Sequence, residues 1–496
     1  MVPAPLRAER RTGRSFMLRP GARIQVARDP AAVAIAVRLA TEIGREVDGP
    51  IAVAHEDSHA TGAIELRLTA SPDDLPVPDG LPAALAAEAY RLEVDQQRAV
   101  ITALEPTGLV RGVQTLIGLI ARDPGHGGAV VEPVLVVDRP RFAWRGLMLD
   151  LARHFFDVET IRTVIEVMAS LKLNVLHLHL TDDQGWRVEI PSRPELVAVG
   201  GPTAVGRDPG GWLSTADYAE LVAFAAAHAV TVVPEIDLPG HVNAALSSDG
   251  ALSPDGRRKP AYTGVEVGFS RLHAALPATA PFIRDVLTEV AGLTSGPYLH
   301  IGGDEVLTME PSEYVELVSM ALDAVGAAGK RVVGWQEIAA VPLPAGAVIQ
   351  YWDEREDLAP VLAAVDRGAQ VLLSPAKRVY LDMKYDDATP VGSEWAGHIG
   401  LESAYSWEPG ELVGLDDRQI AGVEAALWTE TVRTPRELFA LLLPRLAAAA
   451  EVAWSAPERR GYDDFLARLD RTTPQWDAAG WHWYRAALPA AGPAAG

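Results

Sequence analysis

The sequence predicts a (β/α)8 TIM barrel preceded by a smaller N-terminal α/β domain. Between about residues 145 and 430, eight short apolar segments alternate with alanine-rich segments of helical spacing. Polar and aromatic residues follow these apolar segments at their carboxyl ends. In a barrel of parallel strands those ends share one face, where chemistry takes place. At 496 residues, the chain is long enough for two or three domains.

The first 140 residues predict a non-catalytic domain in which a sheet packs against helices. No cluster of polar residues interrupts its apolar segments, so we expect it to support the barrel. The proline-bounded segment 133–140 is interpreted as the junction between domains. The expected strands are 23–26, 51–54, 63–68, 89–94 and 99–103, and the expected helices are 31–47 and 108–120.

The barrel domain is expected to occupy residues 141–485. Its strands and helices span roughly 145–455, more than the typical ~250 residues of this fold, because two loops, 240–281 and 374–422, are long. Such loops are usually functional. The Ala/Pro/Gly-rich tail, 486–496, is expected to be disordered. The expected strands are 146–151, 175–180, 231–236, 298–301, 331–335, 347–352, 370–373 and 423–428, and the expected helices are 158–171, 215–229, 283–293, 312–329, 358–368 and 435–450.

The composition excludes several classes of partner and chemistry. With 66 acidic and 44 basic residues, the formal net charge is −22, which disfavours nucleic acid and anionic membranes but not a neutral sugar. Without cysteine there are no disulfides, thiolate metal sites or cysteine nucleophiles. No apolar run reaches membrane-spanning length. The first 20 residues lack the apolar core of a signal peptide, which favours a cytoplasmic protein; a removed leader would make it a secreted one.

The residues at the carboxyl ends of the eight predicted strands are typical of a sugar-binding site. Indole faces pack on the apolar face of a pyranose, and Asp, Glu and Arg bind its hydroxyls. A metal site built from Asp182, Asp237 and His241 is disfavoured because the surrounding tryptophans indicate a sugar pocket. In strand order the residues are Asp150 with Arg153 and His154, Thr181–Asp183, Glu235–His241, Asp304 with Glu305, Trp335, Trp352, Tyr380–Asp382 and Trp428–Glu430.

The most informative of these ends is His300-Ile301-Gly302-Gly303-Asp304-Glu305. By itself it fits a solvated turn or a helix N-cap equally well. Most glycosidases place two carboxylates on opposite sides of the scissile bond, about 5–5.5 Å apart in retaining enzymes. Neighbouring residues of an extended chain point to opposite faces, so Asp304 and Glu305 fit that arrangement poorly. One can be a general acid, and a substrate that carries its own nucleophile, such as a 2-acetamido oxygen, would complete the chemistry.

These motifs resemble the family-20 glycoside hydrolases, the β-N-acetylhexosaminidases, along nearly the whole chain. The resemblance implies substrate-assisted catalysis, and the first domain is similar to the non-catalytic domain that usually precedes this barrel. The matching segments are Arg145–Asp150, Arg153–Phe156, His177–Arg187, Pro234–His241, His300–Glu305, Val333–Trp335, Gln350–Trp352, Tyr380–Asp382 and Leu427–Glu430.

The resemblance implies catalytic roles for five residues. Glu305 would be the general acid and then the general base. Asp304 would orient the 2-acetamido group and stabilise an oxazolinium-like intermediate, and Tyr380 would donate a hydrogen bond to the acetamido oxygen. Asp182 and His241 would form a relay behind Glu305, although a buried Asp–His pair can also simply satisfy its own hydrogen bonds.

The resemblance also implies a substrate-binding set. The arginine and the two carboxylates would bind hydroxyls of the terminal, non-reducing sugar, and the tryptophans at strand ends would surround the ring and the N-acetyl methyl group. The positions of Trp186, Trp395 and Trp407 stay open between core, pocket rim and leaving-group subsite. His177 and His179 are expected in the barrel wall. The set is Arg153, Val267, Trp335, Trp352, Asp382, Trp395, Trp428 and Glu430.

The implied function is that of an exo-acting, retaining β-N-acetylhexosaminidase without cofactor or metal, monomeric or homodimeric, with a carbohydrate as its substrate. One alternative is a sulfated-sugar or disaccharide-releasing enzyme, which the hydroxyl-binding set disfavours. Another is a silent sugar-binding protein, which the intact Asp304–Glu305 pair disfavours. Some relatives hold the loop after the third strand with a disulfide; without cysteine, loop 240–281 must be held by packing alone or be more mobile.

Overall fold

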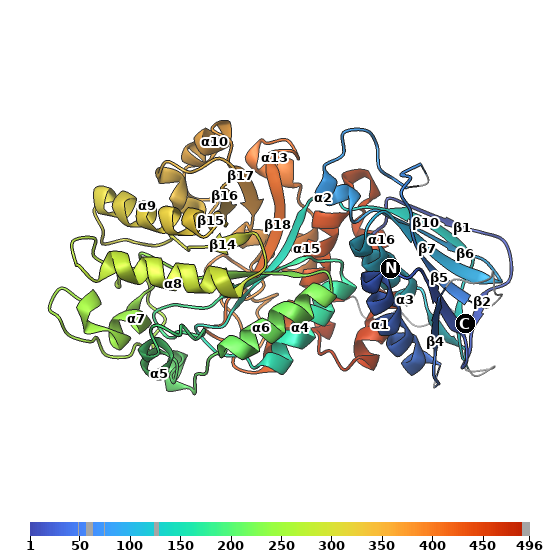
Figure 1. Ribbon diagram of the computed structural model, residues 1–496, viewed down its shortest axis with the longest axis horizontal. Coiled ribbons are helices and arrows are strands. Elements are labelled where there is room, and N and C mark those ends of the chain that lie inside the picture. Colours follow the sequence, from blue (N-terminus) through green and yellow to red (C-terminus); the bar gives the residue numbers. More distant parts are fainter. Residues whose placement is uncertain (48, 56–62, 74, 124–127, 489–496) are drawn as a thin grey trace. The chain divides into compact units, whose positions relative to one another are not determined.

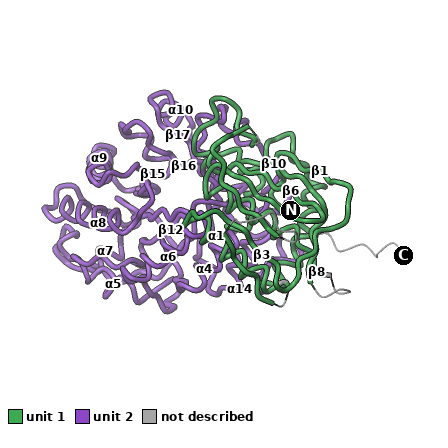
Figure 2. The backbone as a smooth tube through the Cα atoms, turned by 45° about the vertical axis from the view of Figure 1, so that its right-hand side comes forward, with its two compact units in different colours: residues 1–143, 169–172, 450–479 green, residues 144–168, 173–449, 480–496 purple. Residues whose placement is uncertain are grey.

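The computed structural model describes residues 1–47, 49–55, 63–73, 75–123 and 128–488. The chain divides into two compact units (Figure 2). The first comprises residues 1–143, 169–172 and 450–479, and the second comprises 144–168, 173–449 and 480–496. Residues 450–479 thus belong to the first unit, whereas the sequence places them in the barrel domain. Of the tail predicted to be disordered, residues 489–496 lie outside the described part, and its first residues belong to the turn η5 (Arg485–Ala487).

The first unit contains a seven-stranded sheet, a three-stranded sheet and helices (Figure 1). The large sheet has the order β1-β10-β6-β7-β5-β3-β4, parallel from β7 to β4 and antiparallel among the rest. The predicted strands and helices of this domain are confirmed to within two or three residues at each end. Its elements are β1 (Arg7–Arg10), β2 (Phe16–Leu18), β3 (Arg23–Val26), α1 (Pro30–Glu46), β4 (Ala52–His55), β5 (Ala63–Leu68), α2 (Ala83–Ala86), β6 (Tyr90–Val94), β7 (Arg98–Ala103), α3 (Pro106–Ile117), β8 (Ala121–Asp123), β9 (Gly128–Val131), β10 (Val134–Asp138), η4 (Pro457–Arg459) and α16 (Tyr462–Ala478).

The interpretation of segment 133–140 as a junction is wrong. Its central residues form β10, which pairs with both β1 and β6 inside the large sheet. The prolines at its two ends only limit the strand, since proline cannot donate to a ladder. Strand β1 escaped prediction because all of its residues are exposed, so it carries no alternation of apolar and polar residues.

The second unit contains a closed barrel of eight strands paired in parallel, which confirms the predicted fold (Figure 1). Toward the amino ends, apolar side chains such as Trp144, Val233 and Leu372 fill the interior. The strands are β11 (Trp144–Asp150), β12 (Val175–His179), β13 (Thr231–Glu235), β14 (Tyr298–His300), β15 (Arg331–Trp335), β16 (Val348–Tyr351), β17 (Gln370–Leu373) and β18 (Ile420–Leu427).

Helices follow most barrel strands, as predicted, with one correction. The expected single helix 435–450 is two helices, because Pro444 has no N–H to continue the first and its ring clashes with the preceding turn. No helix in the described part of the chain is long and apolar enough to cross a membrane. The helices are α4 (Val158–Ser170), α5 (Glu195–Gly200), η1 (Val205–Arg207), α6 (Thr215–Ala227), α7 (Asn243–Ser248), η2 (Gly250–Leu252), α8 (Thr279–Leu293), α9 (Pro311–Ala327), η3 (Gln336–Ala340), α10 (Ala359–Asp366), α11 (Ala376–Val379), α12 (Leu401–Tyr405), α13 (Pro409–Val413), α14 (Pro435–Leu442) and α15 (Arg445–Trp454).

Two buried arginines hold the loops at the carboxyl ends of the strands. Arg187 donates to the two backbone carbonyls that precede Arg153, at 2.9 and 2.5 Å. Arg445 donates to the carbonyls on either side of Asp382, at 2.5 and 2.7 Å. A guanidinium offers five donors in a fixed plane, so each arginine fixes the backbone from which a predicted substrate-binding residue projects.

Candidate active site

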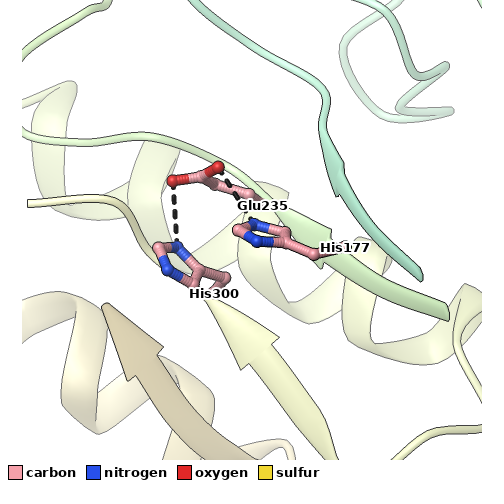
Figure 3. A group of neighbouring side chains, drawn as sticks. All are labelled: His177, Glu235 and His300. Atoms are coloured by element: carbon pink, nitrogen blue, oxygen red, sulfur yellow. Dashed lines mark ion pairs between the residues drawn. The ribbon is translucent and has the colours of Figure 1, made fainter. Parts of the chain in front are cut away.

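A buried network of imidazoles and carboxylates lies at the carboxyl end of the barrel (Figure 3). One oxygen of Glu235 accepts a 2.8 Å hydrogen bond from Trp335 Nε1 and lies 2.9 Å from Nδ1 of His300. The other lies 3.0 Å from Nε2 of His177 and 2.5 Å from Nδ1 of His179. Burial favours the neutral acid, but the three imidazoles outweigh it and hold the pKa of Glu235 well below its usual range.

His177 connects this carboxylate to a second one. Its Nδ1 lies 2.8 Å from Glu424, which also accepts hydrogen bonds from the indole of Trp144 and the amide of Gln350. Burial opposes a charged imidazole, yet Glu235 and Glu424 raise the pKa of His177 to about 9. The two histidines expected in the barrel wall are therefore buried members of an ionic network.

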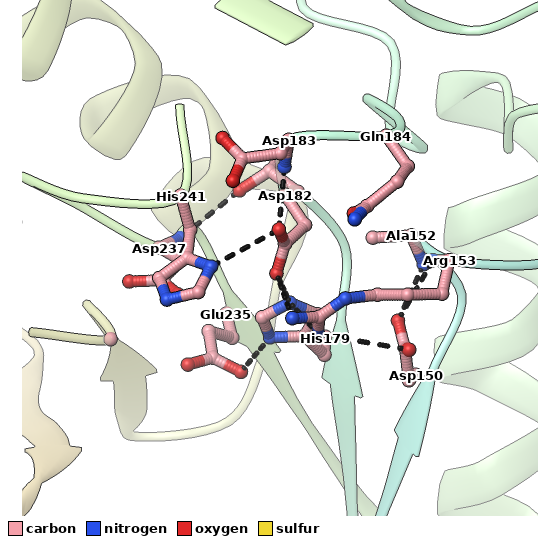
Figure 4. Close-up of polar contacts among 12 residues, drawn as sticks. Asp150, Ala152, Arg153, His179, Asp182, Asp183, Gln184, Glu235, Asp237 and His241 are labelled. Atoms are coloured by element: carbon pink, nitrogen blue, oxygen red, sulfur yellow. Dashed lines mark hydrogen bonds and ion pairs between the residues drawn. The ribbon is translucent and has the colours of Figure 1, made fainter. Parts of the chain in front are cut away.

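Asp182 links that network to the loops above it (Figure 4). One carboxylate oxygen lies 2.8 Å from Nη2 of Arg153 and 2.9 Å from Nε2 of His179, and the other lies 3.1 Å from Nδ1 of His241. Although burial raises the pKa of Asp182, Arg153 and His241 together hold it well below its usual range. Asp182 is thus a buried anion that fixes one nitrogen of His241.

The other nitrogen of His241 faces both carboxylates of the Asp304–Glu305 pair. Its Nε2 lies 3.5 Å from Glu305 and 3.8 Å from Asp304. Burial alone would lower the pKa of His241, but Asp182 and Asp237 hold it well above its usual value. The predicted relay from Asp182 through His241 to Glu305 is therefore present as a geometric chain of contacts.

The backbone of the Gly-Gly-Asp-Glu segment is not extended. Gly302, Gly303 and Glu305 have φ angles of 68°, 107° and 50°, a region that only glycine adopts freely. A Cβ atom at Gly302 would lie 1.7 Å from a carboxylate oxygen of Asp237, so no side chain fits there. This left-handed turn, and not an extended strand, brings the two neighbouring carboxylates to one imidazole.

Asp304 is nearly buried, with 8% of its surface exposed. Burial, partly offset by His241 and reinforced by Glu305, raises its pKa to about 6. Its Oδ1 has no hydrogen-bond partner among the described residues. Because buried polar atoms are nearly always paired, this unpaired oxygen on a residue that lines a cavity indicates a missing donor, such as a ligand's N–H or O–H.

These groups open into a cavity of about 390 Å³. Of the predicted site residues, only Asp182 and His241 do not line it, since they lie behind Glu305 and Arg153. The sequence reasoning did not anticipate Val265, Arg355, Ser393 and Thr431. The lining residues are Arg153, Val265, Val267, Asp304, Glu305, Trp335, Trp352, Arg355, Tyr380, Asp382, Ser393, Trp395, Trp428, Glu430 and Thr431.

Aromatic rings form the walls of this cavity. Trp352 and Tyr380 are stacked, with centroids 6.3 Å apart and an angle of 11° between planes. Trp395 meets both rings edge-on and is 51% exposed, which places it at the rim. Trp186 and Trp407, whose positions the sequence left open, are instead buried at 2% and 8% exposure and do not line the cavity.

Charged side chains gather on another part of the cavity. The guanidinium of Arg153 lies 4.8 Å from the Trp428 ring centre and 3.7 Å from the carboxylate of Glu430. Burial, together with Glu430, raises the pKa of Asp382 well above its usual range. Asp382 Oδ1 has no partner in the described part of the chain. Donors and acceptors at one place on the lining suit a ring with several hydroxyl groups.

Loop 240–281, expected to be held by packing alone or to be more mobile, is held by hydrogen bonds. The carboxylate of Asp183 accepts hydrogen bonds from the Ser270 hydroxyl and, at 2.9 Å, from the backbone of Asn243. The side chain of Asn243 donates to the Pro260 carbonyl at 3.0 Å, and that of Gln184 donates to the Gly264 carbonyl at 3.0 Å. The part of the cavity that Val265 and Val267 line is therefore anchored to the loop after β12.

Among the residues that the structure describes, four groups of buried His, Asp and Glu have donor atoms within 4.8 Å of one another, close enough to hold a metal ion. In these groups most imidazoles face carboxylates at hydrogen-bonding or ion-pair distance. Such contacts are typical of imidazole–carboxylate pairs that satisfy one another and orient the imidazole without a metal ion.

The pH dependence of activity is expected to follow Asp304. The Asp304 carboxylate is protonated and loses its negative charge when the pH falls through its pKa of about 6. We therefore expect kcat/KM to decline below that pH. His241 lowers this pKa, and His241→Gln should therefore move the acidic limb to higher pH. The profile is measured on an activated aryl glycoside, whose leaving group departs without a proton from a general acid. The control is His398→Gln, on the loop after β17; an acidic limb that stays in place in His241→Gln contradicts the assignment.

The barrel, the polar residues at the carboxyl ends of its strands and the cavity lined by carboxylates and aromatic rings define a sugar-hydrolysing enzyme. The chain matches the description "Glycosyl hydrolase family 20, catalytic domain" over residues 142–320 and 310–457, and "Glycosyl hydrolase family 20, domain 2" over residues 1–139. It belongs to glycosyl hydrolase family 20.

Full-length relatives agree with this assignment. The chain is 50% identical to a β-N-acetylhexosaminidase of Cellulomonas fimi, over 98% of this chain and 95% of that one. The family-20 β-N-acetylhexosaminidase of Streptomyces coelicolor A3(2) superimposes with a TM-score of 0.90 at 39% identity, covering 98% of this chain and 97% of that one. A mutant β-hexosaminidase of Streptomyces plicatus, solved with the product GlcNAc, gives a TM-score of 0.91 at 39% identity, with 99% and 97% covered.

Proposed function

We propose that this glycoside hydrolase is an exo-acting, retaining β-N-acetylhexosaminidase that releases terminal GlcNAc or GalNAc by substrate-assisted catalysis. The observation that carries the proposal is the position of the carboxylate pair. Asp304 and Glu305 leave one strand end and face one imidazole, so they do not form an opposed pair across the substrate. The 2-acetamido oxygen of the substrate supplies the missing nucleophile.

In the first step, that oxygen attacks the anomeric carbon and the glycosidic C–O bond breaks. Glu305 gives its proton to the departing oxygen, and Asp304 accepts a hydrogen bond from the acetamido N–H while positive charge develops on the oxazolinium ring. In the second step, Glu305 takes a proton from water, which attacks the anomeric carbon and opens the ring. Two inversions give net retention.

The other carboxyls at the cavity support binding and not nucleophilic attack. Burial and the charge of Glu430 raise the pKa of Asp382 well above its usual range, and a carboxyl that holds its proton more tightly is a poorer nucleophile. With Arg153 and Glu430, it is suited to bind hydroxyls of a terminal sugar, which supports exo action. Tyr380 lines the same cavity beside Trp352, which supports its assignment as the donor of a hydrogen bond to the acetamido oxygen.

The proposal is tested by comparing aryl β-N-acetylglucosaminide, aryl β-N-acetylgalactosaminide and aryl β-glucoside. Hydrolysis should require the acetamido group, because the glucoside has no internal nucleophile, and a thiazoline mimic of the intermediate should inhibit competitively. Equal rates on the acetamido sugars and the glucoside would eliminate acetamido participation. Proton NMR of the first product checks retention of the β configuration.

A further inference from the structure

The short turn η3, directly after β15, lies between two segments that line the cavity: the strand end that carries Asp304 and the segment that carries Trp352. On one side it packs on the strand end that carries Asp304: a Cβ atom at Gly303 would lie 2.6 Å from a methyl carbon of Ile338. On the other side, two polar side chains of the turn, Gln336 and Glu337, reach the segment that carries Trp352. None of these three turn residues lines the cavity.

Gln336 fixes the backbone of that segment. Its side-chain carbonyl accepts hydrogen bonds from the backbone N–H groups of Trp352 and Asp353, each at 2.9 Å, and its amide donates to the carbonyl of Asp353 at 3.2 Å. The side chain of Gln336 is buried, at 6% exposure. These three hydrogen bonds of one buried side-chain amide fix the backbone of Trp352 and Asp353, directly after β16.

Glu337 fixes the ring. The indole Nε1 of Trp352 donates to a carboxyl oxygen of Glu337 at 3.3 Å. Burial, reinforced by the charge of Asp304, raises the pKa of Glu337 to about 8. At neutral pH the group is therefore mostly uncharged, and it can accept the indole hydrogen bond without adding a negative charge beside Asp304.

We infer that Gln336 and Glu337 are positioning residues that determine which N-acyl groups the enzyme accepts, by fixing the backbone and the indole ring of Trp352. The inference rests on the proposed function and on the expectation, implied by the resemblance, that Trp352 is one of the tryptophans around the N-acetyl methyl group. Because Trp352 stacks beside Tyr380, a rotated indole would enlarge the space next to the acetamido oxygen. A pocket held at the size of an acetyl group discriminates against each added methylene.

The test measures kcat/KM of the full-length protein for aryl β-glycosides of N-acetyl-, N-propionyl- and N-butyryl-glucosamine. In Glu337→Ala the preference for N-acetyl over N-butyryl should fall by about tenfold or more, mainly through a higher KM for the N-acetyl substrate and a lower one for the longer acyl groups. Glu337→Gln, whose side-chain carbonyl can still accept the indole N–H, should keep the native preference. Glu356→Gln, an exposed acid on the loop after β16, is the matched control.

Glu337→Met keeps roughly the side-chain volume of glutamate but has no oxygen to accept the indole hydrogen bond. It replaces Glu337→Ala in the test if near-UV circular dichroism shows that the alanine variant folds poorly. An unchanged acyl preference in a folded Ala or Met variant overturns the inference, and so does an equal loss of preference in Glu337→Gln. Failure of the proposed function looks different: the native protein would then cleave the N-acetyl substrate no faster than the corresponding glucoside.

Discussion

Replacing Glu305 by glutamine is expected to reduce kcat for natural, poorly leaving aglycones by about 10²- to 10⁴-fold, the usual contribution of a general acid. That loss corresponds to about 3–5 kcal/mol of transition-state stabilisation. Glutamine keeps the shape of the side chain but cannot give a proton to the departing oxygen. Since only the transition state loses an interaction, KM should change little. The measurement is kcat and KM on a chito-oligosaccharide.

A leaving group that needs no proton provides the internal comparison. With 2,4-dinitrophenyl β-N-acetylglucosaminide, the first step of Glu305→Gln should proceed at nearly the native rate. Turnover then depends on the second step, in which Glu305 is the base, and added azide should accelerate it by replacing water as the nucleophile. A variant that hydrolyses chito-oligosaccharides normally would remove Glu305 from the mechanism. Glu313→Gln, an acid on α9 that pairs with Arg271, is the control for a general effect of losing one carboxylate.

The barrel was predictable because its strands are short apolar runs and many of its helices are alanine-rich segments of helical spacing. Both patterns can be seen in the sequence without any knowledge of contacts. Strand polarity then located the cavity: Arg153 and Trp428 follow β11 and β18, Trp335 is the last residue of β15, and all three line one cavity. Strand β1 had no such signal, because its residues are all exposed.

Parts of the site depend on backbone geometry that the sequence does not display. Glu337 follows Trp335-Gln336, which looks like the start of an ordinary helix, and only the tight turn η3 directs its carboxyl to the indole of Trp352. Arg355 belongs to a charged run that is typical of a solvated loop, but its guanidinium lies 5.6 Å from the Trp395 ring centre at the cavity rim. Both side chains are placed by loops whose course is determined by tertiary contacts.

Replacing Asp304 by asparagine is the second large perturbation. The variant should lose about 10²- to 10³-fold in kcat, the effect of removing one preorganised electrostatic group from a partly dry site. Asp304 is nearly buried, and in the proposed mechanism its negative charge stabilises the positive charge that develops on the oxazolinium ring. An uncharged amide cannot stabilise that positive charge. Its NH₂ group can also face the acetamido N–H, from which the carboxylate of Asp304 would accept a hydrogen bond. The measurement is kcat/KM on aryl β-N-acetylglucosaminide.

Two further results would separate this role from a loss of structure. The acidic limb near pH 6, assigned to Asp304, should disappear from the profile of Asp304→Asn, whereas a misfolded fraction would lower the activity without changing the profile. The variant should also remain inactive on the aryl β-glucoside, because removing the group that orients the acetamido nucleophile does not create a new one. An acidic limb that persists unchanged in Asp304→Asn would mean that another group titrates there, and the buried Asp237, whose pKa is raised by burial and by Asp304 itself, would then be the group to replace next.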